Sequence, residues 1–188
     1  MTKTRLEAFS DAVIAIIMTI MVLELRPPDE ATVEALKPLL PKLSSYLLSF
    51  VFLGIYWNNH HHMLHGTRQI GGAVLWANLH LLFWLSLVPF TTAWMGETGF
   101  AAYPVALYGV VLLLCAIAYT ILTLTIVRAE GEGSAVAAAI GKDVKGKVSI
   151  LIYAISVPLA IVSPYLAGGL YVLVALMWLV PDRRFERR

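Results

Sequence analysis

The sequence predicts an all-α membrane protein, built as a bundle of six transmembrane helices. Hydrophobic residues make up 59% of the 188-residue chain and charged residues 14%, whereas soluble domains carry about 45–50% and about 25%. A helix needs about 20 apolar residues to cross a hydrocarbon layer of about 30 Å, so a chain of this length holds about six spans with short connections. This composition excludes an ordinary water-soluble domain.

Six apolar runs follow one another along the chain, and we expect them to form one membrane domain over residues 1–188. Their approximate bounds are 8–25, 43–64, 72–95, 105–127, 148–166 and 169–180. The first run is preceded by Glu7, contains Asp11 and ends at Glu24 without a small-residue cleavage site, so we interpret it as a span and not as a signal peptide. The last run is short, and we expect it to continue as a polar helix.

The prolines and the connections complete the outline of the bundle. Pro89 in the third run and Pro158 in the fifth each lack a backbone donor, which predicts a kink or weakening of those helices. Residues 26–42 are expected to form a short surface helix at most, and residues 129–146 a Gly- and Ala-rich connection. The single cysteine, Cys115, excludes an intramolecular disulfide and argues against a cysteine metal site.

Basic residues gather in alternate connections, which predicts an orientation. With six spans, one side of the membrane receives most of them, and the opposite connections at 95–104 and 164–169 have none. The residues on the basic side are Lys3, Arg5, Arg68, Arg128, Lys142, Lys145, Lys147, Arg183, Arg184, Arg187 and Arg188. The positive-inside rule then places both termini in the cytoplasm.

The first run differs from the other five because it carries polar groups at its start and a hydroxyl within the span. At about 100° per residue, five side chains fall on one stripe, and they are Phe9, Ile16, Thr19, Ile20 and Leu23. Apolar positions at this spacing more often pack against other helices than line a pore, so the spacing alone does not establish a pore.

Asp11 lies to the side of this stripe and needs a partner on another helix. An ionisable group at membrane depth is a functional hypothesis by default. The candidate partners are His60, His61, His62, His80, Trp57 and Asn78. We favour a buried polar clamp that fixes helix packing over direct contact with a permeant ion.

Three stretches of the chain resemble the transmembrane protein 175 family of potassium channels. They are residues 5–24, which include Arg5 and Phe9-Ser10-Asp11; residues 56–60, which read Tyr-Trp-Asn-Asn-His; and residues 76–78, which read Trp-Ala-Asn, together with Pro89. The remainder of the chain is similar in span number and hydropathy only.

The resemblance implies a fold and an assembly. Bacterial members of that family are six-span subunits that assemble as homotetramers, with the first helix of each subunit around a central pore, whereas the animal protein carries two such units per chain. One Phe-Ser-Asp motif therefore implies the tetrameric form, in a cell membrane and most simply the bacterial plasma membrane, with K⁺ as the permeant ion and no cofactor.

The resemblance also assigns roles to individual residues. It implies that Ile16 forms an apolar constriction, that Thr19 forms a polar layer associated with selectivity, and that Ile20 and Leu23 form further narrow levels. The supporting polar network would consist of Arg5, Phe9, Ser10, Asp11, Trp57, His60 and Asn78.

No Thr-Val-Gly-Tyr-Gly loop is present in the sequence, which excludes a carbonyl filter of the ordinary potassium-channel kind. A ring of Thr19 hydroxyls would replace part of the hydration shell, and a ring of Ile16 would close the path by dewetting. Because such a path offers few coordinating oxygens, we expect a cation preference with weak to moderate selectivity for potassium over sodium.

Other functions stay open from the sequence. His61 and His65 lie one helical turn apart, a spacing suited to bidentate zinc or copper binding, although we expect no metal site and a structural or interfacial role for this histidine cluster. A proton-coupled transporter would also suit an intramembrane acid, but no inverted repeat is visible. A non-conducting membrane scaffold is the third alternative.

Enzymes and nucleic-acid binding proteins find no support in the sequence. The hydrolase, kinase and dinucleotide-binding motifs are absent from the chain, and the formal net charge is only +2. The arginines at 183–188 are better interpreted as a topogenic or lipid-headgroup contact. The expected partners are therefore further copies of the chain, membrane lipids and monovalent cations.

Overall fold

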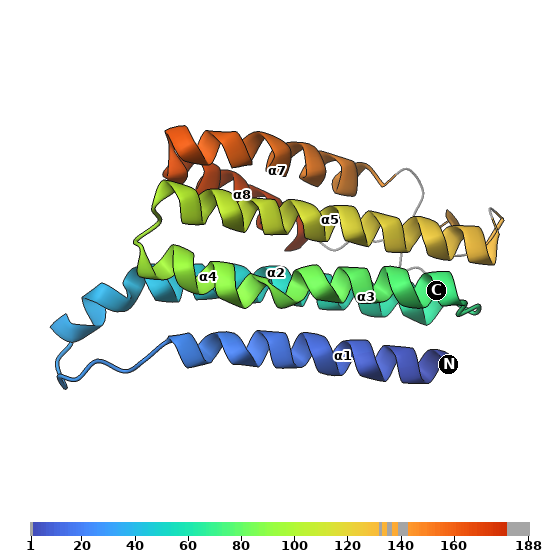
Figure 1. Ribbon diagram of the computed structural model, residues 1–188, viewed down its shortest axis with the longest axis horizontal. Coiled ribbons are helices and arrows are strands. Elements are labelled where there is room, and N and C mark those ends of the chain that lie inside the picture. The colour runs from blue at the N-terminus through green and yellow to red at the C-terminus, as the bar shows by residue number, and fades with distance from the viewer. Residues whose placement is uncertain (1, 132, 135–136, 139–142, 180–188) are drawn as a thin grey trace.

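The computed structural model describes residues 2–131, 133–134, 137–138 and 143–179, and every regular element in this part of the chain is a helix. The helices run roughly along one common direction, with α1 (Lys3–Ile20) at one edge of the bundle and α7 (Val144–Val162) at the opposite edge (Figure 1). The prediction of an all-α protein is confirmed.

The first two spans are joined by a loop and a short helix. After α1, the 3-10 helix η1 (Met21–Glu24) ends the first apolar run, and η2 (Glu34–Leu39) leads into α2 (Leu40–Gly66). The expected short surface helix within residues 26–42 is therefore present as η2. Helix α2 ends at Gly66 because Thr67 is extended, and its amide donates to the carbonyl of Leu64.

The third apolar run is broken into two helices, α3 (Gly72–Ser86) and α4 (Val88–Glu97). Pro89 causes the break, because it cannot donate a backbone hydrogen bond and its ring clashes with the preceding turn. The kink predicted at Pro89 is thus confirmed, whereas Pro158 lies inside an uninterrupted α7.

The remaining helices form the far side of the bundle. Helix α5 (Ala102–Glu130) is followed by α7, whose first turn is capped by the Asp143 carboxylate, and by α8 (Pro164–Leu179). The turn between α7 and α8 lies at Ser163 and not near residues 167–168 as the apolar runs predict, because Pro164 starts the new helix. The predicted end of the sixth run, Lys142 and the arginines at 183–188 lie outside the described residues.

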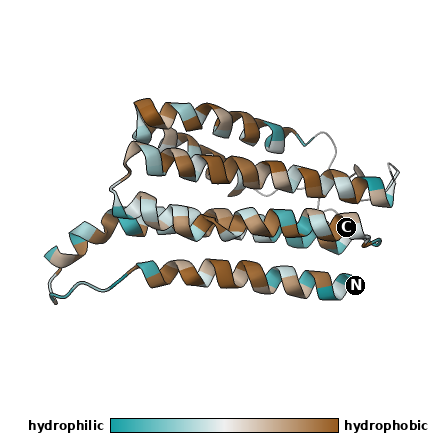
Figure 2. Ribbon diagram, viewed as in Figure 1, coloured by the Kyte–Doolittle hydropathy of each residue, from teal (hydrophilic) through white to brown (hydrophobic). Residues whose placement is uncertain are grey.

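Within the described part of the chain, five helical segments are long and apolar enough to cross a membrane: Lys3–Glu24, Glu34–Gly66, Gly72–Glu97, Ala102–Glu130 and Val144–Val162. Helix α8 is a shorter apolar helix over its described residues. Hydrophobic residues occur along the length of these helices, while hydrophilic residues are concentrated toward the helix ends and in the loops (Figure 2). The chain is a multi-pass membrane protein.

Buried polar groups join the helices inside the bundle. The hydroxyl of Ser49 in α2 lies 2.6 Å from that of Thr92 in α4 and 3.0 Å from that of Tyr108 in α5. In α5, Gly109 allows close approach of α8, because a Cβ at this position would lie 2.1 Å from the hydroxyl oxygen of Tyr171. These contacts hold α2, α4, α5 and α8 together as a frame, and α1 packs on α2 and α4 of this frame and on α3.

Candidate functional site

Helix α1 buries one face and leaves the other uncovered. The buried residues continue from α1 into η1 at spacings of four, four, three and four, which is one helical face. They are Leu6, Ser10, Ile14 and Ile17 of α1 and Met21 of η1. This face packs on α2, α3 and α4. The centre of the stripe predicted from the sequence is turned by about 120° from it, at about 100° per residue.

Ser10 is the polar member of the buried face and starts a chain of hydrogen bonds. The Nδ2 of Asn78 in α3 donates to the Ser10 hydroxyl over 2.9 Å, and the Oδ1 of Asn78 lies 2.6 Å from Nε2 of His60 in α2. All three side chains are at most 1% exposed. Because an amide oxygen only accepts, Nε2 of His60 is assigned as the donor. One buried asparagine thereby links three helices.

Asp11 and Trp57 form a second link between α1 and α2. The indole Nε1 of Trp57 donates to Oδ1 of Asp11 over 3.0 Å. Trp57 is 42% exposed and Asp11 is half-buried, so this contact lies at the margin of the helix pair. The carboxylate has an indole donor and no cation bonded to it among the described residues.

The two helices run antiparallel with a regular register at this end. Lys3 donates through Nζ to the backbone carbonyl of His65, and Asp11 pairs with Trp57, so the residue numbers of each facing pair sum to the same value. The same register places Glu7 beside His61. Oε1 of Glu7 is buried and accepts no hydrogen bond within the described residues, while Lys3 Nζ lies 3.8 Å away.

Arg5 and Phe9 do not join this network. Arg5 is exposed, with no side-chain partner in the described part of the chain, and Phe9 is 44% exposed. Within the described part of the single chain they make no contact with this network, and their membership of it stays a prediction. The physical reason is their helical position: they are turned by about 140° and about 100° from Ser10, away from α2 and α3.

The stripe residues remain uncovered in the single chain. Ile16 is 56% exposed, Ile20 45% and Leu23 71%, and Thr19 is also exposed. The Thr19 hydroxyl donates back to the carbonyls of Ala15 and Ile16, each at 3.0 Å. Since its hydrogen is directed to its own helix, the lone pairs of the hydroxyl oxygen are free to coordinate a cation.

A wide groove runs beside this stripe, between α1 and the α3–α4 segment. It has a volume of about 820 Å³, and its lining includes Ile16 and Ile20 on one side and Phe90 and Trp94 on the other. Glu24 and Glu97 lie on its lining as well. The groove is continuous with the uncovered face of α1.

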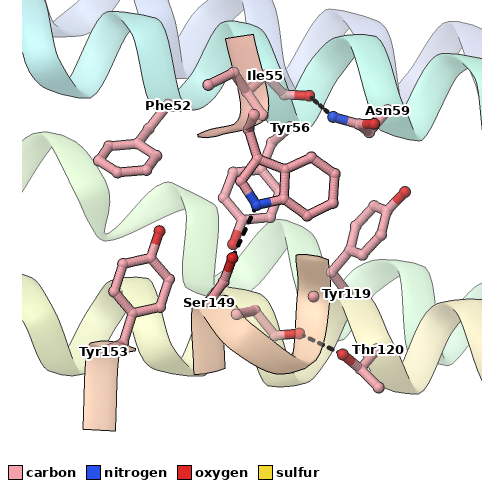
Figure 3. Close-up of a pocket in the computed structure, with 11 residues that line it drawn as sticks. Phe52, Ile55, Tyr56, Asn59, Tyr119, Thr120, Ser149 and Tyr153 are labelled. Carbon is pink, nitrogen blue, oxygen red and sulfur yellow. Dashed lines mark hydrogen bonds between the residues drawn. The ribbon is translucent and has the colours of Figure 1, made fainter. Parts of the chain in front are cut away.

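A second cavity lies among α2, α5, α7 and α8 and has a volume of only about 40 Å³. Figure 3 shows the rings of Phe52, Tyr56, Tyr119 and Tyr153 gathered around it. The nearby amide of Asn59 is bonded to the carbonyl of Ile55 in its own helix. This cavity is small and lined mainly by aromatic and apolar side chains, so it offers no continuous path for an ion.

Sequence reasoning missed several polar contacts that fix the neighbourhood of α1. The Glu130 carboxylate at the end of α5 accepts the backbone amides of Arg68 and Gln69, at 2.5 and 2.6 Å. The Ser49–Thr92–Tyr108 cluster was missed as well. A single hydroxyl within an apolar run does not repeat at a helical spacing, so the sequence pattern does not indicate its partner. The same holds for a carboxylate that bonds a loop distant in sequence.

Comparisons with known proteins agree on one family. The family model described as "Endosomal/lysosomal potassium channel TMEM175" matches residues 5–89. A potassium channel of Chryseobacterium sp. is 52% identical over 187 residues, which cover 100% of this chain and 97% of that protein.

A solved structure and an animal relative extend this likeness. The crystal structure of a lysosomal potassium-selective channel TMEM175 homolog from Chamaesiphon minutus superposes with a TM-score of 0.82 at 28% identity, over 95% of this chain and 96% of that one. The endosomal/lysosomal proton channel TMEM175 of Gallus gallus is 28% identical over 67% of this chain, which spans 25% of the animal protein.

Proposed function

This chain belongs to the TMEM175 family of potassium channels, and from that premise we propose that it assembles as a homotetramer and conducts K⁺ along a central path lined by α1 of each copy. The family consists of ion channels and not of enzymes. The observation that carries the proposal is the two-sided construction of α1. One face is fixed to the bundle, and the other presents Ile16, Thr19, Ile20 and Leu23 uncovered.

The uncovered face supplies the elements that a simple cation path needs. A ring of four Ile16 side chains forms an apolar neck, where a hydrated ion is unfavourable and water is easily expelled. A ring of four Thr19 hydroxyls, each with its hydrogen bonded to its own backbone, presents oxygen lone pairs to the ion. Ile20 and Leu23 add further narrow levels, and this path discriminates weakly to moderately between potassium and sodium.

Two further observations support self-assembly around α1. Ala8, Ala12 and Ala15 lie beside the stripe at spacings of four and three, and small residues allow helices to approach closely within a membrane. His80 lies within the Gly72–Glu97 span and is exposed, with Trp84 Nε1 donating to its Nε2 over 2.9 Å. An exposed imidazole at such a depth is costly against lipid. Cover by another copy of the chain removes that cost.

The polar network fixes the direction in which the uncovered stripe of α1 faces. Ser10 and Asp11 are bonded to Asn78 and Trp57, which fixes the rotation of α1 about its own axis. Because a helix turns by about 100° per residue, a small rotation would move Thr19 off the path. The network thus acts on conduction through geometry and without touching the ion.

The proposed arrangement in the membrane has six spans, with α8 as the sixth, and both termini in the cytoplasm. The positive-inside rule supports this orientation, because the bonds of Lys3 to the His65 carbonyl and of the Arg68 amide to Glu130 bring the start of α1, the end of α2 and the end of α5 together, and each of these carries a basic residue. The proposed membrane is the cell membrane of a bacterium, because the potassium channels that this chain resembles include proteins of Chryseobacterium and Streptomyces. The chain requires no cofactor in this role.

The test is the reversal potential of the purified protein in planar bilayers under opposing gradients of KCl and NaCl. We expect cation-selective currents whose reversal shifts toward the potassium equilibrium potential. Absence of current, or a reversal at the chloride potential, would refute the proposal. Matched recordings with the Thr19→Val variant tie the result to this helix.

Proton permeation is a second candidate, favoured by the name of the animal relative, which is a proton channel. A pH gradient imposed at equal salt separates the two candidates in the same bilayers. A reversal that follows the proton gradient would favour proton permeation, and one that ignores it would favour K⁺.

A further inference from the structure

The end of α2 carries a row of aromatic side chains that the proposed conduction path does not use. Trp57, His61 and His65 follow one another at intervals of four residues. The ring centres of Trp57 and His61 are 6.0 Å apart, and those of His61 and His65 are 6.2 Å apart with an angle of 18° between the ring planes. His61 and His65 are both exposed.

From this geometry we propose that His61 and His65 form a bidentate binding site for a divalent transition-metal cation, with Zn²⁺ as the representative ion. Two histidines at i and i+4 on one helical face are a recurring zinc-binding arrangement, because a single helical turn directs both imidazoles to the same point. Imidazole nitrogen is a ligand that Zn²⁺, Cu²⁺ and Ni²⁺ all accept.

The observed ring separation fits the site after a small adjustment. A zinc ion about 2.0–2.1 Å from each nitrogen lies about 3.2 Å from each ring centre, so a tetrahedral angle places the two centres about 5.2 Å apart. The rings are now 6.2 Å apart, and rotation of exposed side chains closes the difference of about 1 Å. No movement of the backbone is required.

One carboxylate and one ammonium group lie beside the pair, and the ammonium group of Lys3 also bonds the His65 carbonyl. The register of α1 and α2 places Glu7 beside His61, and Oε1 of Glu7 accepts no hydrogen bond within the described residues. A carboxylate beside a metal-ligating histidine is a common second layer of such sites. The positive charge of Lys3, whose Nζ lies 3.8 Å from Oε1 of Glu7, opposes the negative charge of this carboxylate.

Two protein ligands make the site open and of moderate affinity. Among the described residues, no group of three or more His, Cys, Asp or Glu side chains could enclose a metal ion. Water molecules would therefore complete the coordination. The only cysteine, Cys115, is buried in α5 and does not compete for the metal.

Occupation of the site would be transmitted to α1. A bound ion fixes the His61 ring, on which Trp57 stacks, and Trp57 in turn donates to Asp11. Metal binding would thus tighten the contact between α1 and α2. Because the two imidazoles meet only when α2 is helical, binding stabilises the folded state by linkage.

The experiment is calorimetric titration of the full-length protein with ZnCl₂ at about pH 7.5, after removal of any histidine tag. We expect one Zn²⁺ per chain. His61→Ala and His65→Ala should each weaken binding by about tenfold or more, because each removes one of two ligands. The matched control is His80→Ala, which removes a histidine from another helix; because His80 is proposed to lie at the contact between copies, the response of this variant to Zn²⁺ is compared and not its absolute stability.

A second measurement, the melting temperature with and without Zn²⁺, does not depend on conduction. Zn²⁺ should raise it in the wild-type protein and in His80→Ala, and should leave it unchanged in His61→Ala and His65→Ala. Binding that persists in both pair variants, or that falls equally in His80→Ala, would overturn the site. Neither result depends on whether the protein conducts potassium.

Discussion

Replacement of Asn78 by alanine is expected to destabilise the protein more than any other single substitution at the contact between α1 and its neighbouring helices. The Asn78 side chain is fully buried and makes two hydrogen bonds, one to Ser10 at 2.9 Å and one to His60 at 2.6 Å. Asn78→Ala leaves Nε2 of His60 without a partner, and Nδ1 of the same ring already has none. The variant would therefore bury an imidazole with both nitrogens unsatisfied.

The magnitude follows from the number of bonds lost. Side-chain hydrogen bonds within membranes contribute about 0.6 kcal/mol on average and up to about 1.7 kcal/mol, whereas an unsatisfied buried group in a soluble core costs about 1–3 kcal/mol. Ser10 recovers part of the loss, since its hydroxyl can turn to a carbonyl of its own helix. We expect Asn78→Ala to lower the free energy of unfolding by about 1–3 kcal/mol.

The matched control is Asn59→Ala in α2. The Asn59 amide donates only to the carbonyl of Ile55 in its own helix, at 2.8 Å. Both substitutions change asparagine to alanine inside a helix, so the difference in helix propensity cancels. Reversible unfolding of the purified variants in mixed micelles at one protein concentration gives the comparison. A loss for Asn78→Ala no larger than that for Asn59→Ala would refute the role assigned to the network.

Three further substitutions test the stripe and the frame. Ile16→Ser should raise single-channel conductance several-fold, because a hydroxyl wets the apolar neck. Thr19→Val should bring the K⁺/Na⁺ permeability ratio close to one without loss of assembly, as measured by reversal potential and size-exclusion chromatography. Gly109→Ala should lower the melting temperature by several degrees, because its Cβ would meet the Tyr171 hydroxyl at 2.1 Å.

Each of these predictions has a control in the chain. For Ile16→Ser the control is Val22→Ser, which places a hydroxyl on η1 and outside the stripe. For Thr19→Val it is Thr125→Val, which removes a hydroxyl bonded to its own helix in α5. For Gly109→Ala it is Gly54→Ala, which adds a Cβ that meets no atom within 4 Å. Equal effects in a variant and its control would contradict the assigned role. Unchanged conductance in a folded Ile16→Ser oligomer would remove Ile16 from the constriction.

Much of the fold could be predicted from hydropathy, since each apolar run is helical over its described residues, the third as two helices. The pattern also located the break at Pro89, where a backbone donor is missing. It placed the turn between the last two helices several residues too late, because the apolar run continues through Ser163 and Pro164 without a change in hydropathy. The local backbone chemistry of proline, and not the run itself, sets that boundary.

The polar residues of the candidate site could be named from the sequence, but their hydrogen-bond partners could not. Ser10, Asp11, Trp57, His60 and Asn78 were selected because polar groups inside apolar runs need partners. Which group bonds which depends on the register between helices, and no single helix contains that information. For the same reason the sequence does not show that Arg5 and Phe9, which are near Ser10 along the chain, lie on another side of α1 from Ser10 in the single chain.

The connection between α2 and α3 is tied to the end of α5 by two hydrogen bonds. The amides of Arg68 and Gln69 are held by the Glu130 carboxylate, although both residues are exposed. Their hydrogens should therefore exchange slowly with solvent for so exposed a turn, and α2, α3 and α5 should move as one rigid body. Helix α1 lies outside this rigid body and is joined to it by its buried face and by the Ser10–Asn78 and Asp11–Trp57 hydrogen bonds.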